Sequence, residues 1–250
     1  MDVRERYLTW DGCLNVRDLG GHLTETGRTT RFGAVVRADN IRRLTGTGWG
    51  SLVEYGVTTL VDLRSDDEVS SDPPATAPVE IVRMPVLHGG DEQYWERLVA
   101  LSDSAPTDEA AVQAVYESFL ERFHAAFAEA VVAVADAGEG CVVVHCMEGK
   151  DRAGLVSGLL LRLAGVSIEH IAADYALSNA NLAPRIDPWI AEGPTESERA
   201  RRRRISATPA GAMAGTLIRV ESEYGSVRGY LREGGMDDSS IETARNRLIG

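Results

Sequence analysis

The sequence predicts an α/β fold with a mostly parallel central sheet flanked by helices. Short apolar runs rich in β-branched residues alternate with segments of helical periodicity. The runs are continuously apolar, as is typical of strands buried on both faces of a sheet. With 250 residues, 44% of them hydrophobic, the chain can build a substantial core. We expect one domain over 1–250.

Four segments are expected to form the strands. The clearest is 57–63, which follows Gly56 and is rich in valine and threonine. The run 141–145 is almost entirely valine and leads directly into the segment with the most polar chemistry. The other two strands are expected within 33–38 and 79–86.

Helical periodicity separates these strands. Residues 109–137 place apolar side chains at steps of three and four, so they predict one long amphipathic helix that Asp108 caps. Residues 152–164 are apolar nearly all round, which predicts a central buried helix. Another helix is expected from Ser167 to about Leu182.

The remaining C-terminal part divides into two. Residues 184–208 contain several prolines and a run of four arginines, so they predict an irregular segment with one short charged helix. Two interpretations stay open for it: a solvated helix face, or a functional segment that is either a mobile flap over the active site or a contact for an anionic substrate. The last roughly 40 residues are expected to be helical, with breaks near Gly225 and Gly234-Gly235.

Net charge, apolar segment length and cysteine count argue against several classes of protein. The net charge of −12 disfavours a general nucleic-acid binder, although a local positive potential can still bind phosphate. No apolar segment approaches the ~18 residues of a membrane span, and residues 1–6 do not open a signal peptide. Three scattered cysteines are too few for a disulfide framework, which favours a reducing, cytoplasmic location. Because no apolar segment is long enough, we expect no stable membrane insertion.

The informative segment is His145-Cys146-Met147-Glu148-Gly149-Lys150-Asp151-Arg152-Ala153-Gly154. A buried strand enters this segment and a buried helix leaves it. A loop in that setting turns successive backbone N–H groups into one concavity, and the helix N-terminus adds partial positive charge. The segment 147–152 is therefore expected to bind an anion, and phosphate is the natural guest.

Three side chains in this segment can supply the chemistry of phosphate ester hydrolysis. A helix N-terminus and cationic neighbours favour the thiolate form of Cys146, which is a nucleophile. The planar fork of Arg152 matches two phosphoryl oxygens, and Asp151 can protonate the leaving group. The alternative is that Cys146 is a structural thiol beside a surface charge cluster. A zinc site at Cys141, His145 and Cys146 is disfavoured, because neighbours on a strand point to opposite faces.

These residues resemble a known superfamily. His-Cys-x5-Arg resembles the signature loop of the protein tyrosine and dual-specificity phosphatases. Cys-x-x-Gly-Lys-Asp-Arg resembles the bacterial branch of mycobacterial protein tyrosine phosphatase B, which also includes lipid phosphatases. Three further segments resemble motifs of that branch: Asn15-x-Arg17-Asp18-Leu19-Gly20-Gly21, Asp62-Leu63-Arg64-Ser65 and Asp174-Tyr175-x-Leu177-Ser178-Asn179.

The resemblance implies an activity and a set of roles. Cys146 would be the nucleophile, Arg152 the phosphate clamp and Asp151 the acid and base, while Lys150, the single lysine, would contact a substrate phosphate or an inositol ring. Implied substrates are phosphotyrosine, phosphoserine or phosphothreonine in proteins, and phosphoinositides. The resemblance implies no metal and no cofactor. A helical lid is known in that branch, and 184–208 would correspond to it.

Several points stay open at this stage. Ala153 stands where most members have threonine or serine, and Asp91 is a second candidate for the acid. Arg64 and His145 are candidates for supporting the site from behind. Two other functions use a similar anion loop: sulfur transfer or arsenate reduction, and non-catalytic phosphate binding. The oligomeric state is not predicted.

Overall fold

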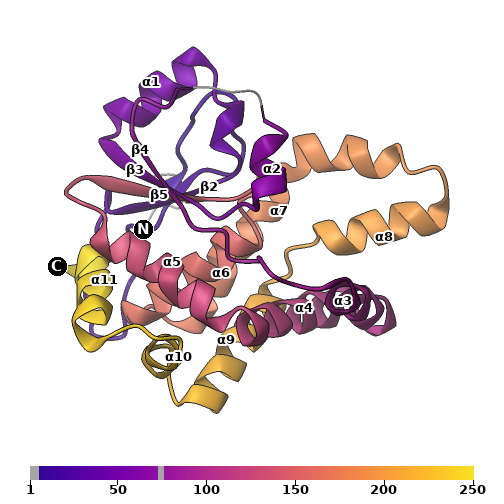
Figure 1. The fold of residues 1–250 in the computed structure, drawn as a ribbon. Coiled ribbons are helices and arrows are strands. Elements are labelled where there is room, and N and C mark those ends of the chain that lie inside the picture. Colours follow the sequence, from indigo (N-terminus) through magenta and orange to yellow (C-terminus); the bar gives the residue numbers. More distant parts are fainter. Residues whose placement is uncertain (1–5, 73–75) are drawn as a thin grey trace.

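The computed structural model describes residues 6–72 and 76–250 (Figure 1). Residues 1–5, on which the expectation of no signal peptide partly rests, lie outside this description. In the described part, five strands form one sheet in the order β1-β2-β5-β3-β4. The strands are β1 (Arg17–Asp18), β2 (Val35–Ala38), β3 (Val57–Asp62), β4 (Glu80–Arg83) and β5 (Cys141–His145). Only β1 pairs antiparallel in this sheet, so the expected mostly parallel α/β fold is confirmed.

Both faces of the central strands are buried, as the continuous apolar runs predicted. Successive residues of β5 alternate between two cores: Val142 and Val144 belong to one, and Cys141 and Val143 to the other. This alternation follows from the two-residue repeat of a strand. The sheet therefore lies between two layers, and β5 at its centre ends in a fixed position beneath the signature loop.

The helices divide between these two layers (Figure 1). The short helix Ile41–Arg43 and α1 (Gly46–Glu54) cover the smaller core. The larger core lies on the other face and takes apolar side chains from most of the remaining helices. These are α4 (Asp108–Arg122), α5 (His124–Asp136), α6 (Arg152–Leu163), α7 (Ile168–Ala191), α9 (Ala210–Tyr224), α10 (Val227–Glu233) and α11 (Asp238–Ile249). Two others, α2 (Asp66–Ser70) and α3 (Glu92–Ser104), follow β3 and β4 in the chain.

The prediction of one long helix over 109–137 is wrong, because the chain forms two helices, α4 and α5, that are separated at Phe123. The backbone of Phe123 leaves the helical region with φ −112° and ψ 29°. Its ring packs at 5.5 Å from Tyr94 and 6.1 Å from Trp95. Apolar spacing continues across the break, so periodicity could not reveal it. The cap is also one residue earlier than expected, since Thr107 Oγ1 accepts the N–H of Ala110.

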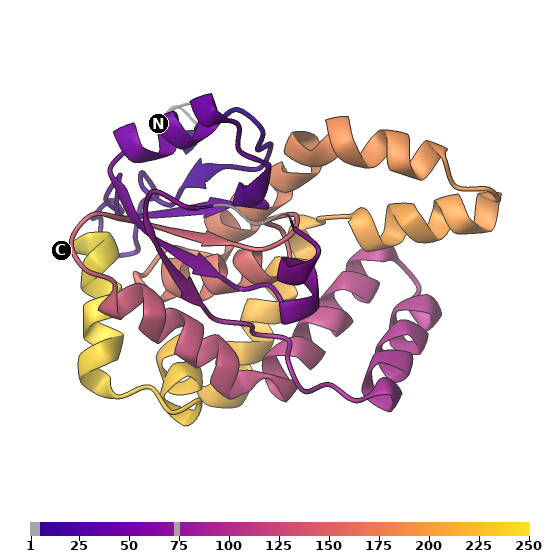
Figure 2. The ribbon, with the colours of Figure 1, turned by 45° about the horizontal axis from the view of Figure 1, so that its top comes forward.

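The prediction of an irregular segment over 184–208 is wrong, because these residues belong to a helical hairpin, although the short charged helix expected within them is present as its second helix. Helix α7 continues through Pro184 and Pro188 to Ala191, and α8 covers Glu196–Ser206. A proline inside a helix costs about 3 kcal/mol, which is why the sequence predicted a stop. The hairpin projects from the body in both views (Figure 1 and Figure 2). Its two helices contact each other where Arg202 of α8 stacks over Trp189 of α7 at 4.7 Å.

Other expectations are confirmed. Residues 152–163 form the buried helix α6, and Ser167 caps α7 through the N–H of His170. Gly225 ends α9 with φ +74°, a conformation that favours glycine. The strand expected over 79–86 is shorter, and β1, α1, α2 and α3 were not anticipated. Of the helices in the described ranges, none combines the length and apolar character that a membrane crossing needs.

Candidate active site

The signature loop connects β5 to α6 at the edge where the parallel strands end. Cys146 follows β5 directly, and α6 begins at Arg152. This is the edge at which open α/β sheets bind ligands. Cys146 is 1% exposed, so its thiol lies at the base of the loop rather than on its rim.

The backbone of this loop has unused donors. Within residues 6–72 and 76–250, the N–H groups of Met147 to Arg152 donate to no protein acceptor. Consecutive free N–H groups beside a helix N-terminus form a concave site for an anion. Gly149 makes the turn possible: its φ is +65°, and a Cβ there would lie 2.5 Å from the carbonyl oxygen of Ala38.

Arg152 is held by a residue that the sequence analysis missed. Its two terminal nitrogens donate to the two carboxylate oxygens of Glu68, one at 2.7 Å. Burial disfavours the charged forms, but the pairing prevails: it raises the pKa of Arg152 and lowers that of Glu68. Glu68 also accepts the N–H of Ser65 at 2.8 Å in a capping box. The Ser65-x-x-Glu68 spacing was the available signal, and it reads only as a helix start.

Glu68→Gln is expected to lower kcat/KM for p-nitrophenyl phosphate about 10-fold, because a hydrogen bond to a charged group is worth roughly 1.5–3 kcal/mol. The amide keeps the shape of the side chain but no longer fixes the guanidinium by charge. Asp67→Asn is the matched control, since Asp67 lies on the same short helix and is exposed. Steady-state kinetics that give equal losses for the two variants would exclude the positioning role.

Asp151 lies at the mouth of the loop with a defined partner. Tyr116 donates its hydroxyl hydrogen to Asp151 Oδ1 over 2.7 Å, and the hydroxyls of Tyr116 and Tyr175 are 2.8 Å apart. Burial and the neighbouring carboxylate raise the pKa of Tyr116 well above its usual range, so it stays a donor. The Asp151 side chain is 37% exposed. The hydroxyl of Tyr116 therefore fixes the orientation of the Asp151 carboxylate, whose exposed part is accessible to a substrate.

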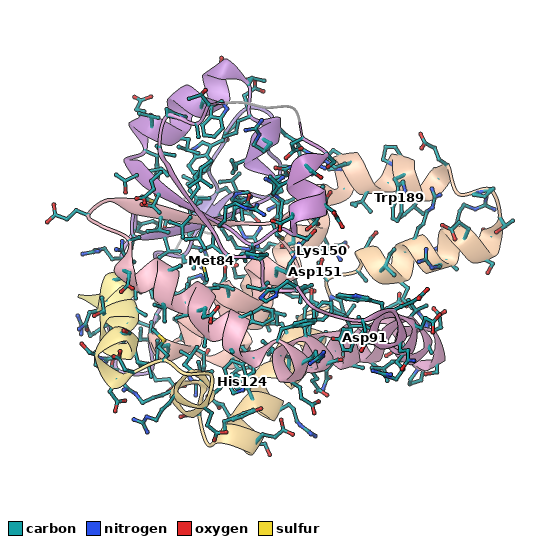
Figure 3. All side chains as sticks on the ribbon, in the orientation of Figure 1. Met84, Asp91, His124, Lys150, Asp151 and Trp189 are labelled. Atoms are coloured by element: carbon teal, nitrogen blue, oxygen red, sulfur yellow. The ribbon has the colours of Figure 1, made fainter. Side chains whose placement is uncertain are left out.

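Asp91, the second candidate for the acid, has a structural task. Its carboxylate caps α3 by accepting the N–H of Tyr94 at 2.7 Å. Figure 3 labels Asp91 on the α3 side, apart from Lys150 and Asp151. The geometry therefore favours Asp151 as the acid.

Lys150 and Glu148 point away from the loop centre toward neighbouring helices. The Lys150 ammonium donates to the carbonyl oxygen of Ile205 in α8 at 2.6 Å and lies 3.2 Å from Asp151. Glu148 accepts from Arg185 of α7 at 2.8 Å. Both loop side chains thus contact the α7–α8 hairpin.

The residues behind the loop form a buried polar layer. His145 is fully buried, and burial lowers its pKa to about 4, so it is neutral at pH 7. Its Nε2 lies 3.7 Å from Asp62. Arg64 donates to Asp62 at 2.8 Å and to Asn40 at 3.0 Å. Asn40 in turn donates its backbone N–H to the Met147 oxygen, so Arg64 is linked to the loop through one residue.

Two features bear on what the site can hold. A cavity of about 400 Å³ adjoins the loop and the hairpin, with Trp189, Ile186 and Ile205 as its apolar walls and Glu148, Lys150, Arg185 and Ser206 completing the lining. In the described ranges, no group of three or more His, Cys, Asp or Glu side chains is placed to hold a metal ion.

Comparisons with known proteins agree with this geometry. A family model described as the tyrosine phosphatase family matches residues 8–250. The chain is 30% identical to the triple specificity protein phosphatase PtpB of Mycobacterium tuberculosis, over 100% of both chains. It is 29% identical to a tyrosine-protein phosphatase of Nostoc commune, over 86% of this chain and 74% of that one. The protein belongs to the tyrosine phosphatase family and is a phosphoric monoester hydrolase.

Proposed function

We propose that the enzyme hydrolyses phosphate monoesters through a phosphocysteine on Cys146. The observation that carries this proposal is the row of free N–H groups from Met147 to Arg152, which lies between the thiol and the start of α6. Such a row binds the three peripheral oxygens of a phosphoryl group and stabilises their charge in the transition state. Arg152 has five N–H donors, of which two bind Glu68, so three remain for the phosphoryl oxygens.

The reaction then proceeds in two displacements. The Cys146 thiolate attacks phosphorus and forms the S–P bond, while the ester O–P bond breaks and Asp151 gives its proton to the leaving oxygen. Water next attacks the phosphocysteine, Asp151 takes one proton from it, and the S–P bond breaks to return the thiolate. The products are an alcohol or phenol and inorganic phosphate.

The direct test is release of phosphate from p-nitrophenyl phosphate in buffer that contains a chelator. We expect turnover to persist under these conditions and to stop after alkylation of Cys146 by iodoacetate. Turnover that requires an added metal ion would contradict the cysteine mechanism. Sulfur transfer and arsenate reduction do not need an acid beside the arginine, so Asp151 speaks against them.

Phosphorylated proteins and phosphoinositides are the proposed substrate classes. The name of the mycobacterial relative describes a phosphatase of triple specificity. The apolar walls of the 400 Å³ cavity suit a substrate with an apolar part, and Lys150 and Arg185 lie at its edge. A panel of phosphotyrosine peptide, phosphoserine peptide and phosphoinositide vesicles, compared by kcat/KM, would rank the classes.

The α7–α8 hairpin is proposed as a lid over this cavity. The bond from Lys150 to the Ile205 carbonyl joins α8 to the loop, and Arg204 of α8 also donates to Asp108 at the start of α4. The far end of the hairpin projects from the body (Figure 2). We also propose a reducing, cytoplasmic location for the enzyme. A phosphatase that depends on the Cys146 thiol loses activity when that thiol is oxidised.

Ala153 leads to a kinetic prediction. Its side chain is completely buried beside the loop and provides no hydroxyl for the Cys146 sulfur. Such a donor would stabilise the departing thiolate in the second step by roughly 1.5–3 kcal/mol, so breakdown of the intermediate is expected to be slow. Rapid mixing should reveal a burst of p-nitrophenol.

Ala153→Ser is expected to raise kcat about 10-fold and to shrink the burst. Serine adds a single oxygen, which the packed site tolerates better than threonine. Ala172→Ser, in another buried part of the same core, controls for general effects of a new hydroxyl. A wild type without a burst, together with an unchanged kcat in Ala153→Ser, would contradict the expectation.

A further inference from the structure

Three consecutive carbonyl groups of the catalytic loop are anchored by residues from the N-terminal part of the chain. The Met147 oxygen accepts the backbone N–H of Asn40 at 3.1 Å. The Glu148 oxygen accepts from Asn15 Nδ2 at 2.9 Å, and the Gly149 oxygen accepts from Arg37 Nη2 at 2.6 Å. Both side chains are buried, so water does not replace these bonds.

These bonds fix the direction of the next N–H groups. In a trans peptide the carbonyl oxygen and the following N–H point to opposite sides of the chain, and no cis peptide occurs in the described ranges. When Asn15 and Arg37 hold the oxygens of Glu148 and Gly149 on the protein side, the N–H groups of Gly149 and Lys150 must point to the opposite side. That side is the anion site.

We propose that Asn15 and Arg37 are positioning residues that orient the backbone donors of the loop toward the substrate phosphate. This inference rests on the proposed function, because it assumes that the loop binds the phosphoryl group. Both side chains are buried and bond to the loop carbonyls, so they act through the loop backbone. Glycine at 149 allows several backbone conformations. The two anchored carbonyls restrict the loop to the one conformation in which its N–H groups point toward the phosphate.

A buried ionic cluster keeps both anchors in place. Arg17 donates to the side-chain oxygen of Asn15, and it also pairs with Asp174 of α7 at 3.3 Å. Arg37 lies 3.4 Å from the same carboxylate. Burial would raise the pKa of Asp174, but the positive charges of Arg17 and Arg37 lower it to about 2. Asp174 is therefore ionised and holds both cations.

The test compares binding of tungstate, an inert tetrahedral oxyanion, by calorimetry. Asn15→Ala is expected to weaken tungstate binding about 10- to 100-fold, the effect of losing an oriented hydrogen bond to a charged ligand. The matched control is Tyr230→Phe, which removes one buried hydrogen bond to the Leu120 carbonyl. The control is expected to lose thermal stability while its tungstate affinity stays unchanged.

A second measurement needs no variant. In the wild type, the amide resonances of Gly149 and Lys150 are expected to shift when tungstate is added. Wild-type binding without these shifts, or Asn15→Ala binding within 2-fold of wild type, would overturn the inference. If the wild type binds no tungstate at all, the proposed function fails instead, so the two failures are distinguishable.

Discussion

Replacing Cys146 by serine is expected to lower kcat on p-nitrophenyl phosphate by about 10⁴-fold or more. A serine hydroxyl is not ionised near pH 7, so the variant has no nucleophile of comparable strength at the base of the loop. The loop N–H groups and Arg152 remain, so tungstate affinity should stay within a few-fold of wild type. Retained binding with lost turnover separates the covalent role of sulfur from anion binding.

Two further variants make this result specific. Cys141→Ala removes another buried thiol, at the start of β5 and outside the loop, and is expected to keep kcat. Arg152→Ala should lower both tungstate affinity and kcat, because it removes the fork that Glu68 orients. Residual activity above a few per cent in Cys146→Ser would exclude the covalent mechanism.

Local patterns predicted the centre of this fold well. The strands β3 and β5 and the helix α6 are almost entirely buried, so their continuously apolar sequences identified them. The strand–loop–helix order then placed Cys146 and Arg152 at one sheet edge. These predictions succeeded because burial and hydrogen bonding within each short segment favour the same structure as the global fold.

Other features depend on contacts between distant parts of the chain. The break at Phe123 coincides with an aromatic cluster that includes α3, and α7, which continues through two prolines, packs against α8 through Trp189 and Arg202. Glu68 and Tyr116 reach the site from separate elements, and no local spacing predicted their contacts with Arg152 and Asp151. Asn15 lies in a motif that the resemblance singled out, but nothing in that motif predicted its bond to the Glu148 oxygen. Sequence thus identified the residues that carry chemistry and some of their neighbours, but not the contacts that hold them.

The identity of the general acid is the remaining mechanistic question, and Asp151→Asn addresses it. The amide has the shape of the carboxyl group and still accepts a hydrogen bond from Tyr116, but it cannot give a proton to a leaving group. General acid catalysis is typically worth about 10²–10⁴-fold. We expect a loss of that size on alkyl phosphates, whose alkoxide leaves poorly without a proton.

On p-nitrophenyl phosphate the loss should be much smaller, because p-nitrophenolate is a stable anion that departs unprotonated. The diagnostic measurement is therefore a plot of log(kcat/KM) against the pKa of the leaving group, which should become steeper in Asp151→Asn than in wild type. Asp91→Asn is the matched control: asparagine is as good a helix cap as aspartate, so α3 stays intact while the candidate acid is lost. A steeper plot for Asp91→Asn, with Asp151→Asn parallel to wild type, would reverse the assignment and require the segment before α3 to move onto the loop during turnover.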